Sequence, residues 1–251
     1  MKRLSHLIVC VVAFGLACAV PTGAEERSPS RADPAATKLL ADARAARALY
    51  HDFPGFKADV EVNLDGKVTR GRVEVSDKGK VTLQLVDAGA ETWAKHTLAS
   101  IVGHRLDNGA AEGETPCAFV DEDAHHPLGR AIRVLNDEFH SSYRIRDRQV
   151  IVVNRQVPGA RFTITVLKNI VTKEDNFLPA SYVVNTWDAK TDALTSSEAH
   201  HQTWQRVGAY DLPKETLSVK ATTGNANSPA HKVPGARLES RSILLSNVHL
   251  K

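Results

Sequence analysis

The feature that most constrains the fold is a hydrophobic period of two that begins after Phe56. Apolar residues at 58, 60, 62 and 64 alternate with polar ones, and Asp65-Gly66 separates them from a second alternating segment at 68–75. This period is typical of strands with one buried face, and Asp-Gly is typical of a tight hairpin turn. Together with a third segment at 81–85, the pattern predicts a three-stranded antiparallel meander.

Seven more segments of strand character fill the C-terminal half of the chain. They are 142–146, 149–157, 160–172, 180–187, 194–206, 212–222 and 237–249, and turn-forming residues such as Pro158-Gly159 and Gly208 separate them. With the first three, they give about ten strands in hairpin succession, which favours a strongly curved antiparallel meander sheet or a half-open barrel.

Two segments have helical spacing instead. Asp33-Pro34 is typical of a helix start, and the residues at 35–49 favour a helix after it. The segment 87–106 has an apolar stripe that includes Trp93, Leu98 and Ile101. The predicted fold is therefore mainly β with a few helices (α+β), with the N-terminal and the second helix packed on the concave face.

The first residues have the pattern of a secretory signal. Lys2 and Arg3 precede an uncharged stretch at 7–20, which is too short for a membrane span of roughly 18 or more apolar residues. Cleavage after Ala24 is preferred over cleavage after Ala19, and lipid attachment at Cys18 is a third possibility. We therefore predict a signal peptide at 1–24, a disordered spacer at 25–33 and a single β-rich domain at 34–251, exported to the periplasm or secreted, without a transmembrane segment in the mature chain.

Charge and cysteine content exclude several classes of protein. Removing Lys2 and Arg3 from 32 basic residues leaves about +1 against 29 acidic residues, which gives no electrostatic reason to expect a nucleic-acid partner. Cys117 is alone in the mature chain, so neither an internal disulfide nor a cysteine metal cluster can form. Glycine-rich phosphate loops are also absent from the sequence, and no cofactor is expected.

Carboxylates and imidazoles gather at 121–126, where Asp123, His125 and His126 are the best candidates for a metal site. Adjacent histidines of an extended chain point apart, however, and no established ligand spacing is present. We interpret this segment as a solvated loop and find no catalytic residue elsewhere. His200 and His201 fall within one predicted strand, so one should point inward and one outward.

Four stretches resemble a family of exported bacterial proteins of uncharacterised function: FPGFKADV, YRIRDRQVIVVNRQVPGARFTI, RVGAYDLPKETL and SNVHL. More distantly, the layout is similar to periplasmic lipoprotein-carrier folds, in which a curved antiparallel sheet holds helices on its concave side. That resemblance implies an apolar cavity for acyl chains.

These patterns favour a non-enzymatic, exported binding or carrier protein for a lipid or another apolar small molecule. A cavity would lie between Trp93, Leu98 and Ile101 of the second helix and Phe162, Ile164 and Val166 of the sheet. Two alternatives remain: an envelope scaffold with a plugged core that binds a partner protein, and a metal-dependent hydrolase that uses the 121–126 segment. What fills the concave face decides between them.

Overall fold

The computed structural model describes residues 31–107, 115–223 and 237–251. The predicted signal peptide, Cys18 and most of the predicted spacer lie outside these residues. Within them, the helices are α1 (Pro34–Ala45) and α2 (Ala88–Gly103). The strands are β1 (Phe56–Leu64), β2 (Lys67–Val75), β3 (Val81–Gln84), β4 (Cys117–Phe119), β5 (Arg130–Val134), β6 (Ser142–Arg146), β7 (Gln149–Val157), β8 (Ala160–Val171), β9 (Phe177–Asp188), β10 (Leu194–Val207), β11 (Tyr210–Thr222) and β12 (Arg237–Leu250).

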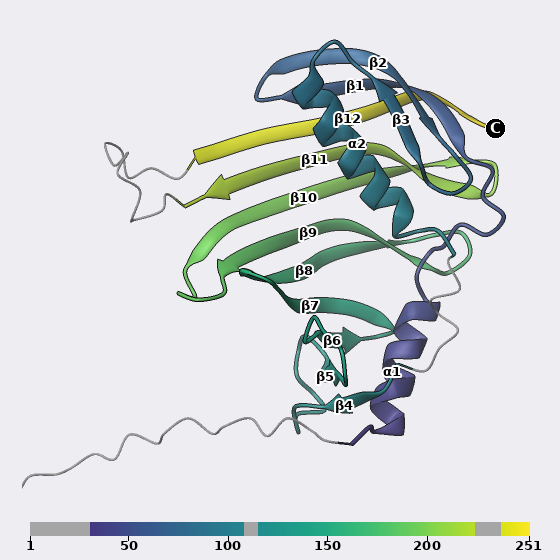
Figure 1. Cartoon of the computed structure of the whole chain (residues 1–251). Helices are drawn as coiled ribbons and strands as arrows, with labels where there is room; N and C mark the ends of the chain where they lie inside the picture. Colours follow the sequence, from purple (N-terminus) through teal and green to yellow (C-terminus); the bar gives the residue numbers. More distant parts are fainter. Residues whose placement is uncertain (1–30, 108–114, 224–236) are drawn as a thin grey trace, which may run out of the picture.

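All of these strands form one open antiparallel sheet, in the order β3-β2-β1-β12-β11-β10-β9-β8-β7-β6-β5-β4. Figure 1 shows the sheet curving around the two helices, with β2 and β3 at one end and β4 at the other. The mainly-β prediction with two helices is thus confirmed, and the meander is interrupted at one place, where β1 pairs with β12.

The predicted number of strands was too low, because β4 and β5 were missed. β4 has three residues, which is too short to show alternation, and Arg130 and Arg133 give β5 a polar composition. Both strands are nevertheless part of the sheet, since Cys117 pairs with Val134 and Ile132 pairs with Tyr143.

Both helices begin at aspartate N-caps. Asp33 accepts hydrogen bonds from the amides of Ala35 and Ala36, and Asp87 accepts one from the amide of Ala90 at 2.9 Å. Such caps satisfy amides that have no partner within the helix. Neither helix is long and apolar enough to cross a membrane within the part of the chain that the structure describes.

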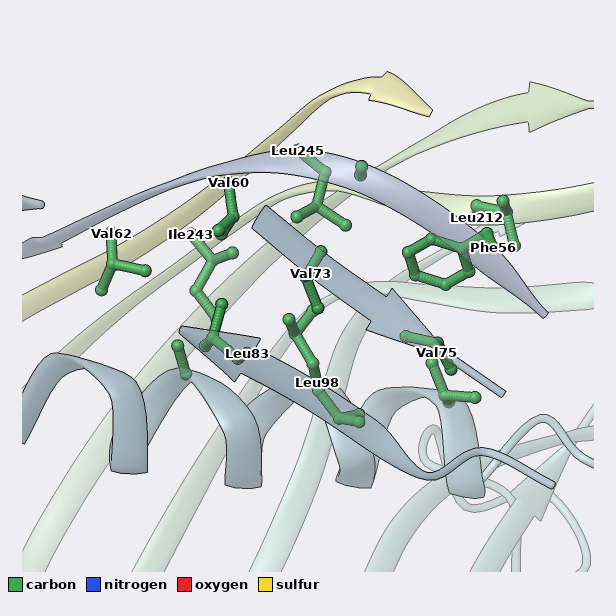
Figure 2. Packing of buried hydrophobic residues seen from close by; sticks show 14 of the residues in the cluster. Phe56, Val60, Val62, Val73, Val75, Leu83, Leu98, Leu212, Ile243 and Leu245 are labelled. Atoms are coloured by element: carbon green, nitrogen blue, oxygen red, sulfur yellow. The ribbon is translucent and has the colours of Figure 1, made fainter. Parts of the chain in front are cut away.

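The helices divide the hydrophobic core into two clusters. α2 packs on β1 and β3, where Leu98 is fully buried together with Val62 and Ile243, as Figure 2 shows. α1 packs on β4 and β6, where Leu40 and Ile132 are buried. Each edge strand therefore has a helix packed on it, and its length of only three or four residues limits pairing with another chain.

The connection from α1 to β1 and the segment that follows α2 lie side by side at one end of the strands. Residues 46–55 lead from α1 to β1, and residues 104–107 follow α2. The two connections pair with each other, since the amide of Tyr50 donates to the carbonyl of Arg105 at 2.6 Å. They also contact the sheet where β9 begins, because the amide of Phe177 donates to the carbonyl of Ala46 at 2.8 Å. This arrangement places Arg47, Tyr50 and Arg105 beside the inner face.

Leu98→Ala should lower the free energy of unfolding by about 2–5 kcal/mol, because it removes a fully buried side chain from the core under α2. Urea denaturation followed by circular dichroism measures this change. Leu167 is 66% exposed, so Leu167→Ala is a matched control that should cost less than about 0.5 kcal/mol. Equal losses in both variants would contradict the placement of Leu98 in the core.

Candidate functional site

Strand register shows which residues share the inner face of the sheet with the helices. Val166 of β8 pairs with Tyr182 of β9, Tyr182 pairs with His200 of β10, and His200 pairs with Ser218 of β11. Ser218 in turn pairs with Arg241 of β12, two residues from Ile243 in the core under α2. Because directly paired residues point to the same side of a sheet, the whole row faces inward.

We call the middle of this surface, between the two helix-covered cores, the central inner face. It comprises Phe162, Ile164, Val166, Tyr182, Val184, Glu198, His200 and Ser218. One part of it is apolar: Phe162, Ile164, Val166 and Val184 lie on neighbouring strands, are only partly buried, and belong to neither core cluster. These side chains leave apolar surface available inside the curve of the sheet.

The other part is polar and centres on His200. Its ring stacks on Tyr182 with 4.5 Å between the ring centroids, and its Nε2 lies 3.7 Å from a carboxylate oxygen of Glu198. Desolvation lowers the pKa of His200, and the charge of Glu198 opposes this shift. Desolvation also raises the pKa of Tyr182 to about 12, while Arg105 acts to lower it. His200 is therefore mainly neutral and Tyr182 is a phenol at neutral pH.

Ser218, His200 and Glu198 are the residue types of a hydrolase triad, but their geometry differs from one. The hydroxyl of Ser218 is buried and has no hydrogen-bond partner among the described residues. A nucleophilic serine is activated by a hydrogen bond to its base and must be reached by the substrate. Ser218 lacks this hydrogen bond in the structure, so the row does not support a nucleophile.

Arg105, which follows α2, borders the central inner face at the end where the two connections lie. Its side chain is 8% exposed and lies over the ring of Trp204, 5.3 Å from the ring centroid. Desolvation lowers the pKa of Arg105 to about 10, so the group keeps its positive charge at neutral pH. Its Nε has no hydrogen-bond partner among the described residues. Burying such a donor without a partner costs about 1–3 kcal/mol.

The residues that the sequence proposed for the cavity fall into two groups. Phe162, Ile164 and Val166 lie together on the central inner face. Leu98 and Ile101 are buried in α2, with Leu98 inside the core cluster, whereas Trp93 is partly buried and has the guanidinium of Arg241 over its ring at 5.9 Å. Trp93 thus contacts both the edge of the core under α2 and Arg241 of β12. A role for these six residues in ligand binding stays a prediction.

The segment at 121–126 has a structural explanation. Asp121 forms ion pairs with Arg130 and Arg144, and the ring Nδ1 of His126 accepts a hydrogen bond from the amide of Leu128. Asp123 accepts one from the amide of His125. In the described parts of the chain, no three His, Cys, Asp or Glu side chains are placed to hold a metal ion. The geometry therefore gives the metal-dependent hydrolase no support.

A pocket of about 630 Å³ is lined in part by Tyr50, Phe53 and Leu106. Its lining includes Asp52, Asp77, Lys78 and an ion pair in which His51 Nδ1 lies 2.9 Å from Asp107. Charged groups dominate this lining, so the pocket suits an acyl chain less well than the central inner face does.

Sequence reasoning missed Arg105, Tyr182 and Glu198. The alternation along β10 places Glu198 and His200 on one side of the strand. The prediction that one of the two adjacent histidines points inward is confirmed, since His200 faces inward and His201 is exposed. Arg105 carries no comparable signal, because it lies in a connection whose path depends on which strands pair.

His200→Gln should reduce the loss of stability at acid pH. Because burial lowers the pKa of His200 in the folded protein, the unfolded chain binds a proton more readily, and stability falls as the pH drops below about 6.5. We expect the free energy of unfolding to fall less in this variant than in the wild type between about pH 7.5 and about pH 5.5. Urea denaturation at both pH values measures the difference.

His201→Gln is the control for this experiment, since His201 is exposed on the outer face. It should keep the wild-type difference between the two pH values. A wild-type difference in His200→Gln as well would show that His200 is not a source of the pH dependence.

Comparison of the sequence with models of known protein families gives a match. A family model described as "Protein of unknown function (DUF3386)" matches residues 31–232, which include both helices and all strands except the last. No curated protein matches the sequence. The match confirms the resemblance to an uncharacterised family. The chain therefore belongs to the DUF3386 family of proteins of unknown function.

Proposed function

We propose that this protein is a non-enzymatic binding protein that holds an apolar, acyl-type ligand against the central inner face. The observation that carries the proposal is the set of partly exposed apolar side chains at Phe162, Ile164, Val166 and Val184, inside the curve of the sheet and outside both cores. Fully burying a side chain of this kind contributes about 1.5–3 kcal/mol. A ligand chain lying across these strands would gain part of that free energy.

The placement of the helices supports the same function. α1 and α2 pack near opposite edges of the sheet (Figure 1), and each of them covers one core cluster. The strands between them are long, with β8 to β12 spanning 12 to 14 residues each. A curved sheet of this width offers more inner surface than two short helices cover.

We also propose that the protein is exported and that residues 1–24 are removed. α1 begins at Pro34, so cleavage after Ala24 leaves every described helix and strand intact. A carrier of this kind would take an apolar ligand through the periplasm or outside the cell.

An envelope scaffold is the second candidate function. Leu217 of β11 and Leu238 and Leu244 of β12 are exposed, and register places them on the outer face of the sheet. Exposed apolar side chains on adjacent strands are typical of surfaces that bind proteins. The two functions use opposite faces, so substitutions on the inner face separate them.

Ile164→Gln should weaken the binding of dodecanoate about tenfold, because it replaces an apolar contact by a polar amide. Isothermal titration calorimetry on protein stripped of bound lipid measures the affinity. Thr165→Gln places the same amide on the opposite face of β8 and should leave the affinity unchanged. Folded wild-type protein that does not bind dodecanoate would rule out the carrier function.

Export can be tested by expressing the full chain with its own N-terminus in a bacterial host and measuring the intact mass of the protein from the cell envelope. We expect a mass that starts at Glu25. A mass starting at Cys18 with added acyl groups would show a lipid-anchored protein instead, and retention of Met1 in the cytoplasm would contradict export.

A further inference from the structure

Two guanidinium groups converge where α2 ends. Arg47 Nη2 and Arg105 Nη1 both donate to the carbonyl oxygen of His104, the residue that caps this helix. The pKa of His104 is lowered first by desolvation and then by the positive charges of Arg105, Arg47 and Arg155. Three arginines therefore act on one short stretch of chain.

No carboxylate of the described residues lies within ion-pair distance of Arg47 or Arg105. The carbonyl end of a helix attracts cations, which accounts for the two bonds to His104. It does not account for the buried Nε of Arg105, which has no partner among the described residues. The Nε edge of a guanidinium is one of the edges that bind carboxylates and phosphates with two parallel hydrogen bonds.

Arg105 lies next to the central inner face. It stacks on Trp204 of β10, and its charge acts on Tyr182 of β9. Tyr182 pairs directly with Val166 and is followed on the same face by Val184. Gln202, two residues before Trp204 on β10, donates to the hydroxyl of Tyr182 at 3.4 Å, so the contact of Arg105 with Trp204 borders the row that leads to Val166.

We infer that Arg105 binds the oxyanion head group, a carboxylate or a phosphate, of an amphiphile whose apolar chain lies against Val166, Ile164 and Val184. This inference rests on the proposed function and narrows its ligand to anionic amphiphiles. Arg47, which is more exposed, adds a second positive charge beside the head group. A charged head group then offsets the positive charge that the fold buries at this position.

The experiment compares dodecanoate and dodecyl phosphate with 1-dodecanol, which has the same chain without the charge, and with acetate and inorganic phosphate, which lack the chain. Calorimetric titration is run on the wild type, on Arg105→Met and Arg105→Lys, and on the control Arg72→Met. The side chain of Arg72 is 91% exposed and pairs with Asp59 on the opposite face of the sheet. Unfolding in urea is measured for every variant.

We expect the wild type to bind both anionic amphiphiles at least about tenfold more tightly than 1-dodecanol, as a charge-assisted hydrogen bond predicts. Arg105→Met should remove that preference while keeping or raising the urea midpoint, because the variant no longer buries a charge without a carboxylate partner. Arg105→Lys should keep part of the preference, and Arg72→Met should keep all of it.

Three outcomes would overturn the inference. Equal affinity for dodecanoate and 1-dodecanol, unchanged by Arg105→Met, would leave the carrier function in place without a head-group site. A lower urea midpoint in Arg105→Met with unchanged affinities would assign Arg105 a structural role only. Binding of acetate or phosphate as tight as that of dodecanoate would show an anion site that makes no use of the apolar chain. If no chain-bearing compound binds, the proposed function fails as well.

Discussion

The antiparallel pairing of β1 with β12 is the interaction on which the rest of the structure depends. It joins the N-terminal hairpins to the C-terminal end of an otherwise sequential meander. Because α1 packs on β4 at the opposite edge, the chain passes from one edge of the sheet to the other in residues 46–55, and residues 104–107 after α2 lie beside this connection. The two segments pair with each other through Tyr50 and with the start of β9 through Phe177.

The same topology leaves the sheet open, and it makes the inner face differ between the ends of the sheet, which the helices cover, and the middle, which they leave partly exposed. α1 and α2 each cover a short edge strand, and the apolar residues gather beneath them. Between the helices, the inner face changes from the polar group around His200 to the apolar group around Ile164 within two strands. A surface that has a polar part beside an apolar part matches an amphiphile better than a purely apolar molecule.

The buried charge of Arg105 is the clearest departure from what stability alone would favour. Arg105 is 8% exposed and its Nε has no partner among the described residues, and burying such a donor costs about 1–3 kcal/mol. Local conflicts of this kind are expected at functional sites, where binding rather than folding determines the residue. Ser218 is a weaker example, since its buried hydroxyl also has no partner in the described part of the chain.

The sequence by itself determined the strand-rich class, the presence of both helices, the Asp33 cap of the first, the Asp65-Gly66 hairpin and the opposite directions of His200 and His201, because each depends on residues close together in the chain. It missed β4 and β5, whose few residues show no period. Only the tertiary structure decided that β1 pairs with β12, that Leu98 lies in the core while Ile164 stays partly exposed, and that Arg105 lies over the ring of Trp204. These depend on contacts between residues about a hundred or more positions apart in several cases, and local patterns carry no information on such pairings.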